Sequence, residues 1–346
     1  MTTLYLDRKN TQLKIDGQTL VCYINEQRQR PIPLLLLERL VISCAAELSS
    51  QVLLRLASAG IAVTFINPRN STQQAMVLGP AAKNPHLRLW HYQAVHDATF
   101  RDAIAQQWIL AKVRNQRRFL QRQLETRADL RYPFTKAIDQ LSDAVASLQS
   151  PVDVVRLRGI EGNAARIGFG AYQRLFAESL GFTGRKRRPP PDPVNACLSL
   201  AYTLLHSRAV QLAYAQGLDP MLGFLHEPKY SRDSLAADLI EPWRPHVDEF
   251  VWRLFNEREL RADDFTTDQN GCLLAKAGRI NAEFFKQLYI AQCHHPPADL
   301  STNALAGDRL KRVCLAEGHT PVFRNLYDGR GQRVFTGAFQ AGRQLQ

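Results

Sequence analysis

The sequence lacks long apolar runs and closely spaced cysteines. No stretch reaches the roughly eighteen consecutive apolar residues that a membrane-spanning helix needs. No basic-then-apolar leader opens the chain, so we expect neither a membrane span nor secretion, and a cytoplasmic location. The six cysteines are far apart and form no CxxC motif, which predicts reduced and mostly buried thiols.

Acidic residues are also scarce relative to basic ones. The chain has 44 lysines and arginines against 32 aspartates and glutamates, a formal net charge of +12. Such an excess is typical of proteins that bind polyanions, although a generic basic protein has it too. With 346 residues the chain is long enough to bury a core and to form two domains.

Residues 1–84 predict a small β-rich domain. Residues 3–25 alternate and turn at Asp16-Gly17, which predicts a hairpin of short strands. Further elements are expected at 33–42 (a strand), 49–59 (a helix starting near Ser49 or Ser50) and 61–66 (a strand).

Residues 85–300 predict a larger, helical domain. Gly79, Pro80 and Pro85 mark the expected linker before it. The fold class is therefore α+β, with a β-rich amino-terminal domain followed by an all-α domain, and 301–346 is expected to be a partly ordered tail.

Two basic segments lie in the helical part. The first, 101–131, predicts a helix whose cations form a solvated face or contact phosphates; they are Arg101, Lys112, Arg114, Arg117, Arg118, Arg122, Arg127 and Arg131. The second, 184–193, combines Arg185, Lys186, Arg187 and Arg188 with prolines, which block a helix and predict an exposed loop. This loop is either a phosphate-binding segment or a solvated connector.

Glu161 is unusual because it falls within an apolar helical stripe. A carboxylate there loses several kcal/mol of hydration unless it is paired, protonated or bound to metal. A salt bridge to Arg158 or Arg166 is the simpler explanation, and a ligand role is the alternative. The stripe consists of Val154, Leu157, Ala165, Gly168, Tyr172 and Leu175.

The stretch 221–245 supplies further candidate ligands. His226 follows an apolar run, and Asp238 and Glu241 come three residues apart in a short helical pattern. Taken alone, these residues are more often a core histidine and the solvated face of a helix than a metal site. Pro242 biases Glu241 away from helix and suggests that one helix ends there as the next begins.

A zinc site is not favoured. Its candidate ligands have the wrong spacing for a compact site; they are Cys272, Cys293, His294, His295, Cys314 and His319.

Several blocks, in order, resemble a known family. They are MTTLYLDRKNTQLKIDGQTLVCY and RLVISCAAELSSQVLLRLASAGIAVTFIN near the amino terminus, RGIEGNAAR at 158–166, DPVNACLSLAYTLL at 192–205, GFLHEPKYSRDSLAADLIEPWRP at 223–245 and DDFTTDQNGCLLAKAGR at 263–279. Over residues 1 to about 300 the chain is similar to the CRISPR-associated adaptation endonuclease and integrase family, which inserts new spacers into CRISPR arrays.

The resemblance implies a metal site and its chemistry. Glu161, His226 and Glu241 match the family's catalytic, metal-ligating set, and Asp238 would be a supporting or auxiliary carboxylate. One imidazole and two carboxylates suit Mg²⁺ or Mn²⁺. The implied reaction is attack of a DNA 3′-hydroxyl on a phosphodiester, or hydrolysis when water attacks.

The resemblance also implies partners. These are double-stranded DNA (prespacer and CRISPR repeat), a second copy of the chain paired through residues 1–84, and a small ferredoxin-like adaptation subunit bridging two such dimers. Lys229, Arg232 and Arg244, with the four cations of 184–188, could contact phosphates, although ion pairs with nearby acids would explain the first three equally well. Ser231 and Asp233 depart from the glycine and the neutral residue that many relatives have.

Two other functions stay open. One is a transposon-encoded integrase that uses the same site on the ends of a mobile element. The other is a catalytically silent DNA-binding scaffold.

Overall fold

The computed structural model describes residues 2–67, 70–82, 85–186, 189–269 and 271–274. The predicted tail at 301–346, the predicted helical segment from 275 to 300, and Arg187 and Arg188 lie outside these residues. So do five of the six residues considered for zinc, namely Cys293, His294, His295, Cys314 and His319.

The amino-terminal region contains a four-stranded sheet whose strands lie in the order β1-β6-β8-β9. Its strands are β1 (Thr2–Leu6), β6 (Leu37–Ile42), β8 (Ala62–Asn67) and β9 (Asn70–Val77). β1, β6 and β8 are parallel, and β9 is antiparallel to β8. The inner strands β6 and β8 are buried at most positions, which is typical of inner strands in a parallel sheet. The strand predicted within 33–42 is confirmed at Leu37–Ile42, after a 3₁₀ turn at Leu34–Leu36, and the strand predicted at 61–66 is confirmed as β8.

A second sheet is built on the predicted hairpin, in the order β4-β3-β2-β7, with β5 also on β3. Its strands are β2 (Thr11–Asp16), β3 (Thr19–Ile24), β4 (Gln27–Arg28), β5 (Ile32–Pro33) and β7 (Ala46–Leu48). Asp16 faces Thr19 across the turn, where Gly17 adopts φ +58°. The hairpin is therefore confirmed for 11–24, but β1 belongs to the other sheet.

Helix α1 (Ser50–Ser58) packs against this β-rich region. It starts after Ser49 and ends before Gly60, whose φ of +73° suits only a residue without a Cβ. Leu56 is fully buried together with Leu13, Leu40 and Val63. Each such side chain contributes about 1.5–3 kcal/mol by leaving water.

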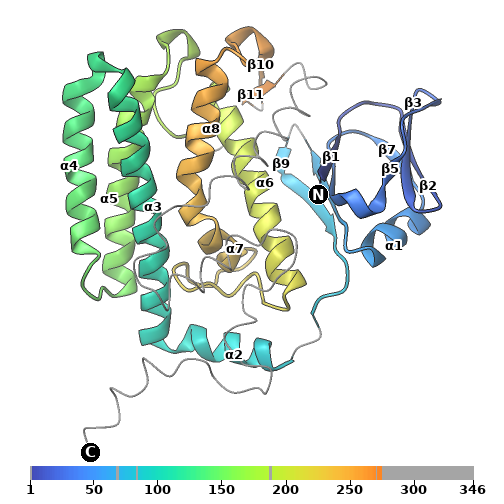
Figure 1. Cartoon of the computed structure of the whole chain (residues 1–346), viewed down its shortest axis with the longest axis horizontal. Helices are drawn as coiled ribbons and strands as arrows, with labels where there is room; N and C mark the ends of the chain where they lie inside the picture. Colours follow the sequence, from blue (N-terminus) through green and yellow to red (C-terminus); the bar gives the residue numbers. More distant parts are fainter. Residues whose placement is uncertain (1, 68–69, 83–84, 187–188, 270, 275–346) are drawn as a thin grey trace, which may run out of the picture. The chain divides into compact units, whose positions relative to one another are not determined.

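Beyond residue 84 the described chain is mostly helical, as expected (Figure 1). The helices are α2 (Pro85–His96), α3 (Ala98–Thr126), α4 (Arg131–Ser147), α5 (Val154–Tyr172), α6 (Pro193–Ala215), α7 (Ser234–Leu239) and α8 (Arg244–Asn256). Aspartate side chains accept backbone N–H groups at the starts of α3, α5 and α6, where those groups have no helical partner. The change from strands to helices falls between Val77 and Pro85, and the domain boundary at 84 stays a prediction.

Helix α3 is the central element of the helical region. It packs against α4, α5 and α8, and Figure 1 shows α3, α4 and α5 side by side. A short hairpin, β10 (Phe265–Asp268) with β11 (Gly271–Leu274), departs from the predicted all-α composition. The β-branched Thr266 and Thr267 favour strand there.

Within the residues described, no helix is both long enough and apolar enough to span a membrane.

Candidate active site

The buried lysine Lys112 bridges two carboxylates from other elements. Its ammonium group on α3 donates to Oε1 of Glu161 on α5 and, at 2.6 Å, to Oε2 of Glu241. Lys112 and Glu241 are only 5% and 4% exposed, whereas the side chain of Glu161 retains 27% exposure. The prediction that the cations of 101–131 form a solvated face is therefore wrong at Lys112.

Glu161 lies where the helical pattern predicted, but its partner is a different one. Leu157 and Ala164, one turn away on either side, are buried, so Glu161 is on the face of α5 that packs against other helices. The predicted salt bridge to Arg158 or Arg166 is replaced by Lys112, 49 residues away in the sequence.

Glu241 is a buried carboxylate with two cationic partners, Lys112 and Arg244. It opens a 3₁₀ turn (Glu241–Trp243) between α7 and α8, as Pro242 suggested, and its Oε1 accepts from Nε of Arg244 at 2.8 Å. Asn115 donates to the carbonyl of Pro242 at 3.1 Å and ties the turn to α3. Burial alone raises the pKa of Glu241, but Arg244 and Lys112 outweigh it and hold that pKa at about 2.

His226 is oriented by Asp238, a fully buried carboxylate. Nδ1 of His226 lies 2.5 Å from Oδ1 of Asp238. Because a carboxylate only accepts, Nδ1 is the nitrogen that donates, and in the neutral tautomer with that hydrogen Nε2 has the lone pair. Burial raises the pKa of Asp238, while the imidazole and the backbone N–H groups act in the opposite direction. His226 also lowers the pKa of Glu241, so the imidazole acts electrostatically on that glutamate.

The turn that carries His226 is fixed from three sides. The same Asp238 accepts the backbone N–H groups of Phe224, Leu225 and His226 at 2.7, 2.9 and 3.2 Å. Arg158, one turn before Glu161 on α5, donates twice to the carbonyl of Leu225, at 2.9 and 2.7 Å. A Cβ at Gly223 would lie 2.6 Å from Oδ2 of Asp238, so this position needs glycine. Sequence reasoning did not find Arg158 in this role.

The donor types of the site suit a hard divalent cation. Two carboxylates already converge on one positive charge, and the imidazole of His226 acts electrostatically on one of them. Among the residues that the structure describes, no three His, Cys, Asp or Glu side chains form a group that could hold a metal ion as they stand. In this site the ammonium of Lys112 lies between the two glutamates.

The exposed turn after His226 carries two of the residues that were predicted to contact phosphates, Lys229 and Arg232. Lys229 and Tyr230 are exposed, and Arg232 is half-buried. Ser231 adopts φ +59°, a backbone conformation that favours glycine.

Two of the other predicted cations, Arg244 and Arg185, are bonded within the protein. Arg244 pairs with Glu241 and stacks over the ring of Tyr202 at 5.0 Å. Arg185 donates to Asn195 and Ser199 at 3.0 and 3.1 Å. Lys186 is exposed, with its backbone N–H bound to Asn195. The loop is thus anchored to the start of α6 by Asn195, which sequence reasoning did not identify.

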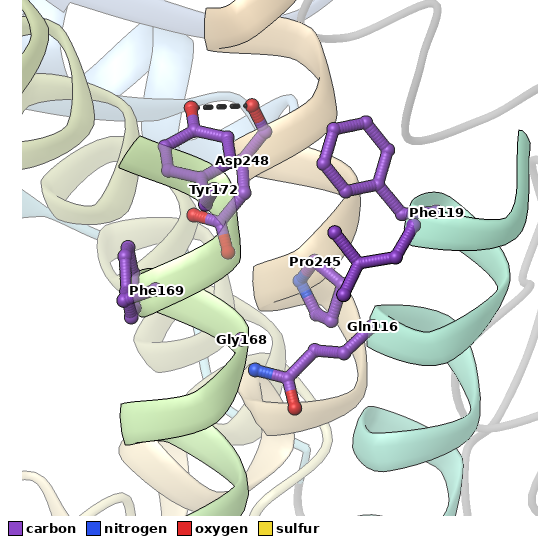
Figure 2. A pocket seen from close by; sticks show the side chains of 8 residues that line it. Gln116, Phe119, Gly168, Phe169, Tyr172, Pro245 and Asp248 are labelled. Atoms are coloured by element: carbon purple, nitrogen blue, oxygen red, sulfur yellow. Dashed lines mark hydrogen bonds between the residues drawn. The ribbon is translucent and has the colours of Figure 1, made fainter. Parts of the chain in front are cut away.

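A further buried acid, Asp248, lies on α8 two helical turns beyond Glu241. It accepts from the hydroxyl of Tyr202, and its carbonyl accepts from Tyr172 at 2.7 Å. Asp248 and Gln116 flank a cavity of about 20 Å³ between α3, α5 and α8, which has room for about one water (Figure 2). Within the described part of the chain, the buried Oε1 of Gln116 has no hydrogen-bond partner.

Asp248 should make stability depend on pH. Burial raises its pKa from 3.8 to about 6, against the effects of Tyr202, Lys112 and Arg244. A raised carboxyl pKa favours the protonated, folded form, so this contribution is present at low pH and is lost as pH rises through about 6. Asp248→Asn keeps an acceptor for Tyr202 and removes the titration. Its free energy of unfolding, relative to wild type, should rise by about 1.5 kcal/mol between pH 5 and pH 8.

Urea unfolding at several pH values measures this difference. The exposed Asp139→Asn on α4 is the matched control and should show no such trend. A constant difference between wild type and Asp248→Asn across this range would contradict the prediction.

Lys112 had a recognisable signal in the sequence. The buried face of α3 repeats at helical period, and Lys112 occupies one of its positions between apolar and amide residues; that face is Ala105, Trp108, Ile109, Lys112, Val113, Asn115, Gln116, Phe119, Leu120 and Gln123. A lysine in a buried stripe needs an anionic partner, but the stripe does not say which one.

Solved structures share this fold. A Cas1 protein from Thermotoga maritima matches with a TM-score of 0.70 and 24% identity, over 84% of this chain and 89% of that one. A casposase bound to integration product matches with a TM-score of 0.69 and 21% identity, over 84% and 83%. A chain of a Cas6-RT-Cas1–Cas2 complex matches with a TM-score of 0.71 and 23% identity, over 90% of this chain and 34% of that one. The β-rich region followed by a helical region is thus the fold of Cas1-type proteins.

Sequence comparison gives the family. The model of the family described as CRISPR associated protein Cas1 matches residues 4–285. A CRISPR-associated endonuclease Cas1 from Thermodesulfovibrio yellowstonii is 38% identical over 282 residues, 81% of this chain and 88% of that protein. One from Rhodospirillum rubrum is 36% identical over 79% of this chain and 81% of that protein. The chain belongs to the Cas1 family, which indicates a CRISPR-associated nuclease.

Proposed function

We propose that the protein is a metal-dependent DNA endonuclease and integrase that inserts spacer DNA into CRISPR arrays by 3′-hydroxyl transesterification. One observation carries the proposal: Glu161 and Glu241 meet at a single positive charge, and an imidazole whose orientation Asp238 fixes acts electrostatically on Glu241. Such convergence of distant acids and a histidine is costly to build and is typical of a catalytic site.

Glu161, Glu241 and Nε2 of His226 would hold the cation, either Mg²⁺ or Mn²⁺. When bound, the cation supplies charge for the phosphoryl oxygens and lowers the pKa of the attacking hydroxyl. Asp238 accepts a hydrogen bond from Nδ1 of His226 and so fixes the orientation of the ring. Arg244 holds Glu241 from its other oxygen, and Arg158 keeps the His226 turn against α5.

The reaction balances without a further co-reactant. The 3′-oxygen of the incoming DNA forms a bond to the phosphorus at the repeat end. The bond from that phosphorus to the 3′-oxygen of the neighbouring nucleotide breaks, and this oxygen leaves as a hydroxyl. Water in place of the 3′-hydroxyl gives nicking instead. Lys229, Arg232 and Lys186, on exposed turns, would neutralise flanking phosphates in a chain of net charge +12.

The proposed partners are a second copy of the chain, paired through residues 1–84, and a small ferredoxin-like adaptation subunit that bridges two dimers. Their support is the family assignment, together with a shared fold in a chain of the Cas6-RT-Cas1–Cas2 complex.

A transposon-encoded integrase is the second candidate, favoured by the likeness to a casposase. The curated relatives, which are named CRISPR-associated endonucleases, favour the first. The targets separate the two: a CRISPR repeat should direct insertion under the first proposal, and terminal inverted repeats under the second.

The test is strand transfer into a supercoiled plasmid that carries a CRISPR repeat. Protein stripped with a chelator should be inactive, and Mn²⁺ or Mg²⁺ should restore joining of a prespacer duplex with free 3′-hydroxyl ends. Duplexes with 3′-deoxy ends should allow nicking but no joining. Joining by 3′-deoxy ends, or by metal-free protein, would contradict the mechanism, and a plasmid without the repeat is the control for target choice.

A further inference from the structure

The charges of the site are already balanced without a metal ion. Glu161 and Glu241 contribute two negative charges, and Lys112 and Arg244 contribute two positive ones, joined by hydrogen bonds. A divalent cation added to this arrangement would bring like charges together in a largely buried site, where they repel strongly. One of the resident cations must therefore move.

Of the two resident cations, Lys112 is the one that occupies oxygens of both proposed glutamate ligands. It bonds to both glutamates, whereas Arg244 bonds to Glu241 alone and is also stacked on Tyr202. Its four-carbon stem has more freedom than a stacked guanidinium. Moving the ammonium group of Lys112 away would free one carboxylate oxygen on Glu161 and one on Glu241. These two glutamates are proposed metal ligands.

The structure also offers the displaced ammonium another place. Gln116 lies one helical turn after Lys112 on α3, and its buried Oε1 has no hydrogen-bond partner in the described structure. Gln116 borders the small cavity that Asp248 borders from α8, as Figure 2 shows. Lys112 is close enough for its charge to lower the pKa of Asp248. A carboxylate and an orphan amide oxygen beside a cavity are suitable acceptors for an ammonium.

We propose that Lys112 is a resident counter-cation that competes with the divalent cation for Glu161 and Glu241, and that it turns toward Gln116 and Asp248 when metal binds. The inference rests on the proposed metal-dependent function. Metal-free, Lys112 joins Glu161 to Glu241 and gives the buried Glu241 a second cationic partner besides Arg244. The metal affinity of the protein is then set partly by the free energy of moving this one side chain.

Mn²⁺ binding to the full-length protein, measured by the electron paramagnetic resonance signal of the free ion, tests the competition. Lys112→Met removes the charge at similar length and should tighten Mn²⁺ binding at least about tenfold. Lys112→Arg keeps the charge and should bind as weakly as wild type or more weakly. The exposed Lys136→Met on α4 is the matched control and should match wild type.

Thermal unfolding gives a second readout. Without metal, Lys112→Met should unfold at a lower temperature than wild type, because Glu241 loses a buried partner. Saturating Mn²⁺ should raise its midpoint more than that of wild type. A smaller rise in the variant than in wild type would count against the competition.

A double-mutant cycle tests the second position of the ammonium. Gln116→Leu in wild type should weaken Mn²⁺ binding several-fold, because the displaced Lys112 loses an acceptor. The same change in Lys112→Met should have no effect. An equal effect in both backgrounds would overturn this position.

Failure of the inference and failure of the proposed function give different results. Measurable Mn²⁺ binding that is equal in wild type and Lys112→Met overturns the competition and leaves the metal site standing. Absence of Mn²⁺ binding in both proteins overturns the metal assignment, and the inference with it.

Discussion

Glu161→Gln should reduce strand transfer and nicking at least about 100-fold at saturating Mn²⁺. The amide keeps the size of the side chain and an oxygen for Lys112, but it removes the negative charge that a hard cation requires. The side chain is partly exposed, so folding should be little affected. Initial rates on the repeat-containing plasmid, with circular dichroism of the same samples, measure both effects.

Glu178→Gln is the matched control. Glu178 is exposed in a short 3₁₀ turn after α5, so its substitution should leave both rates unchanged. Wild-type rates for Glu161→Gln would remove Glu161 from the ligand set and would favour a catalytically silent scaffold.

Asp238→Ala should lower the free energy of unfolding by about 3–5 kcal/mol and abolish activity. The carboxylate accepts three successive backbone N–H groups and the imidazole of His226, and its side chain is fully buried. Alanine leaves those donors without an acceptor in the interior and releases the turn that presents His226.

Urea unfolding measures the change in stability, with the exposed Asp139→Ala as control for loss of an aspartate. Asp238→Asn separates the two effects of the carboxylate, because its oxygen still accepts from part of the turn but its charge is gone. The role of Asp238 as the anchor of this turn would be disproved by Asp238→Ala unfolding at the wild-type urea concentration.

Local elements of the β-rich region were predictable where one residue pattern allows one conformation. The Asp16-Gly17 turn, the helix from Ser50 to Ser58 and the strand β8 were found from their alternation, caps and glycines. β9 was missed because its polar sequence, NSTQQAMV, lacks the alternation of a half-buried strand. The parallel pairing of β1 with β6, 35 residues away, has no local signal at all.

The candidate site was predictable in its residue types but not in its contacts. Glu161 could be recognised because a carboxylate in an apolar stripe needs a reason, and the same argument applied to Lys112, which was taken for a surface residue. Arg185 was taken for a DNA contact because it lies in a basic loop, yet it is bonded to Asn195 and Ser199. Sequence gives the charge of a loop but not the anchors beneath it.

The sequence by itself determined the class of each element, the excess of positive charge and the acids and histidine that do not fit a plain amphipathic helix. Those features are local, since they depend on side-chain chemistry at periods of two or 3.6 residues. Only the tertiary structure decided which charges meet. Lys112 lies 49 residues from Glu161 and 129 from Glu241, and packing of α3 against α5 and the 3₁₀ turn brings them together. Because these charges are buried, the contacts between them matter for stability: a charge removed from water is costly unless a partner lies nearby.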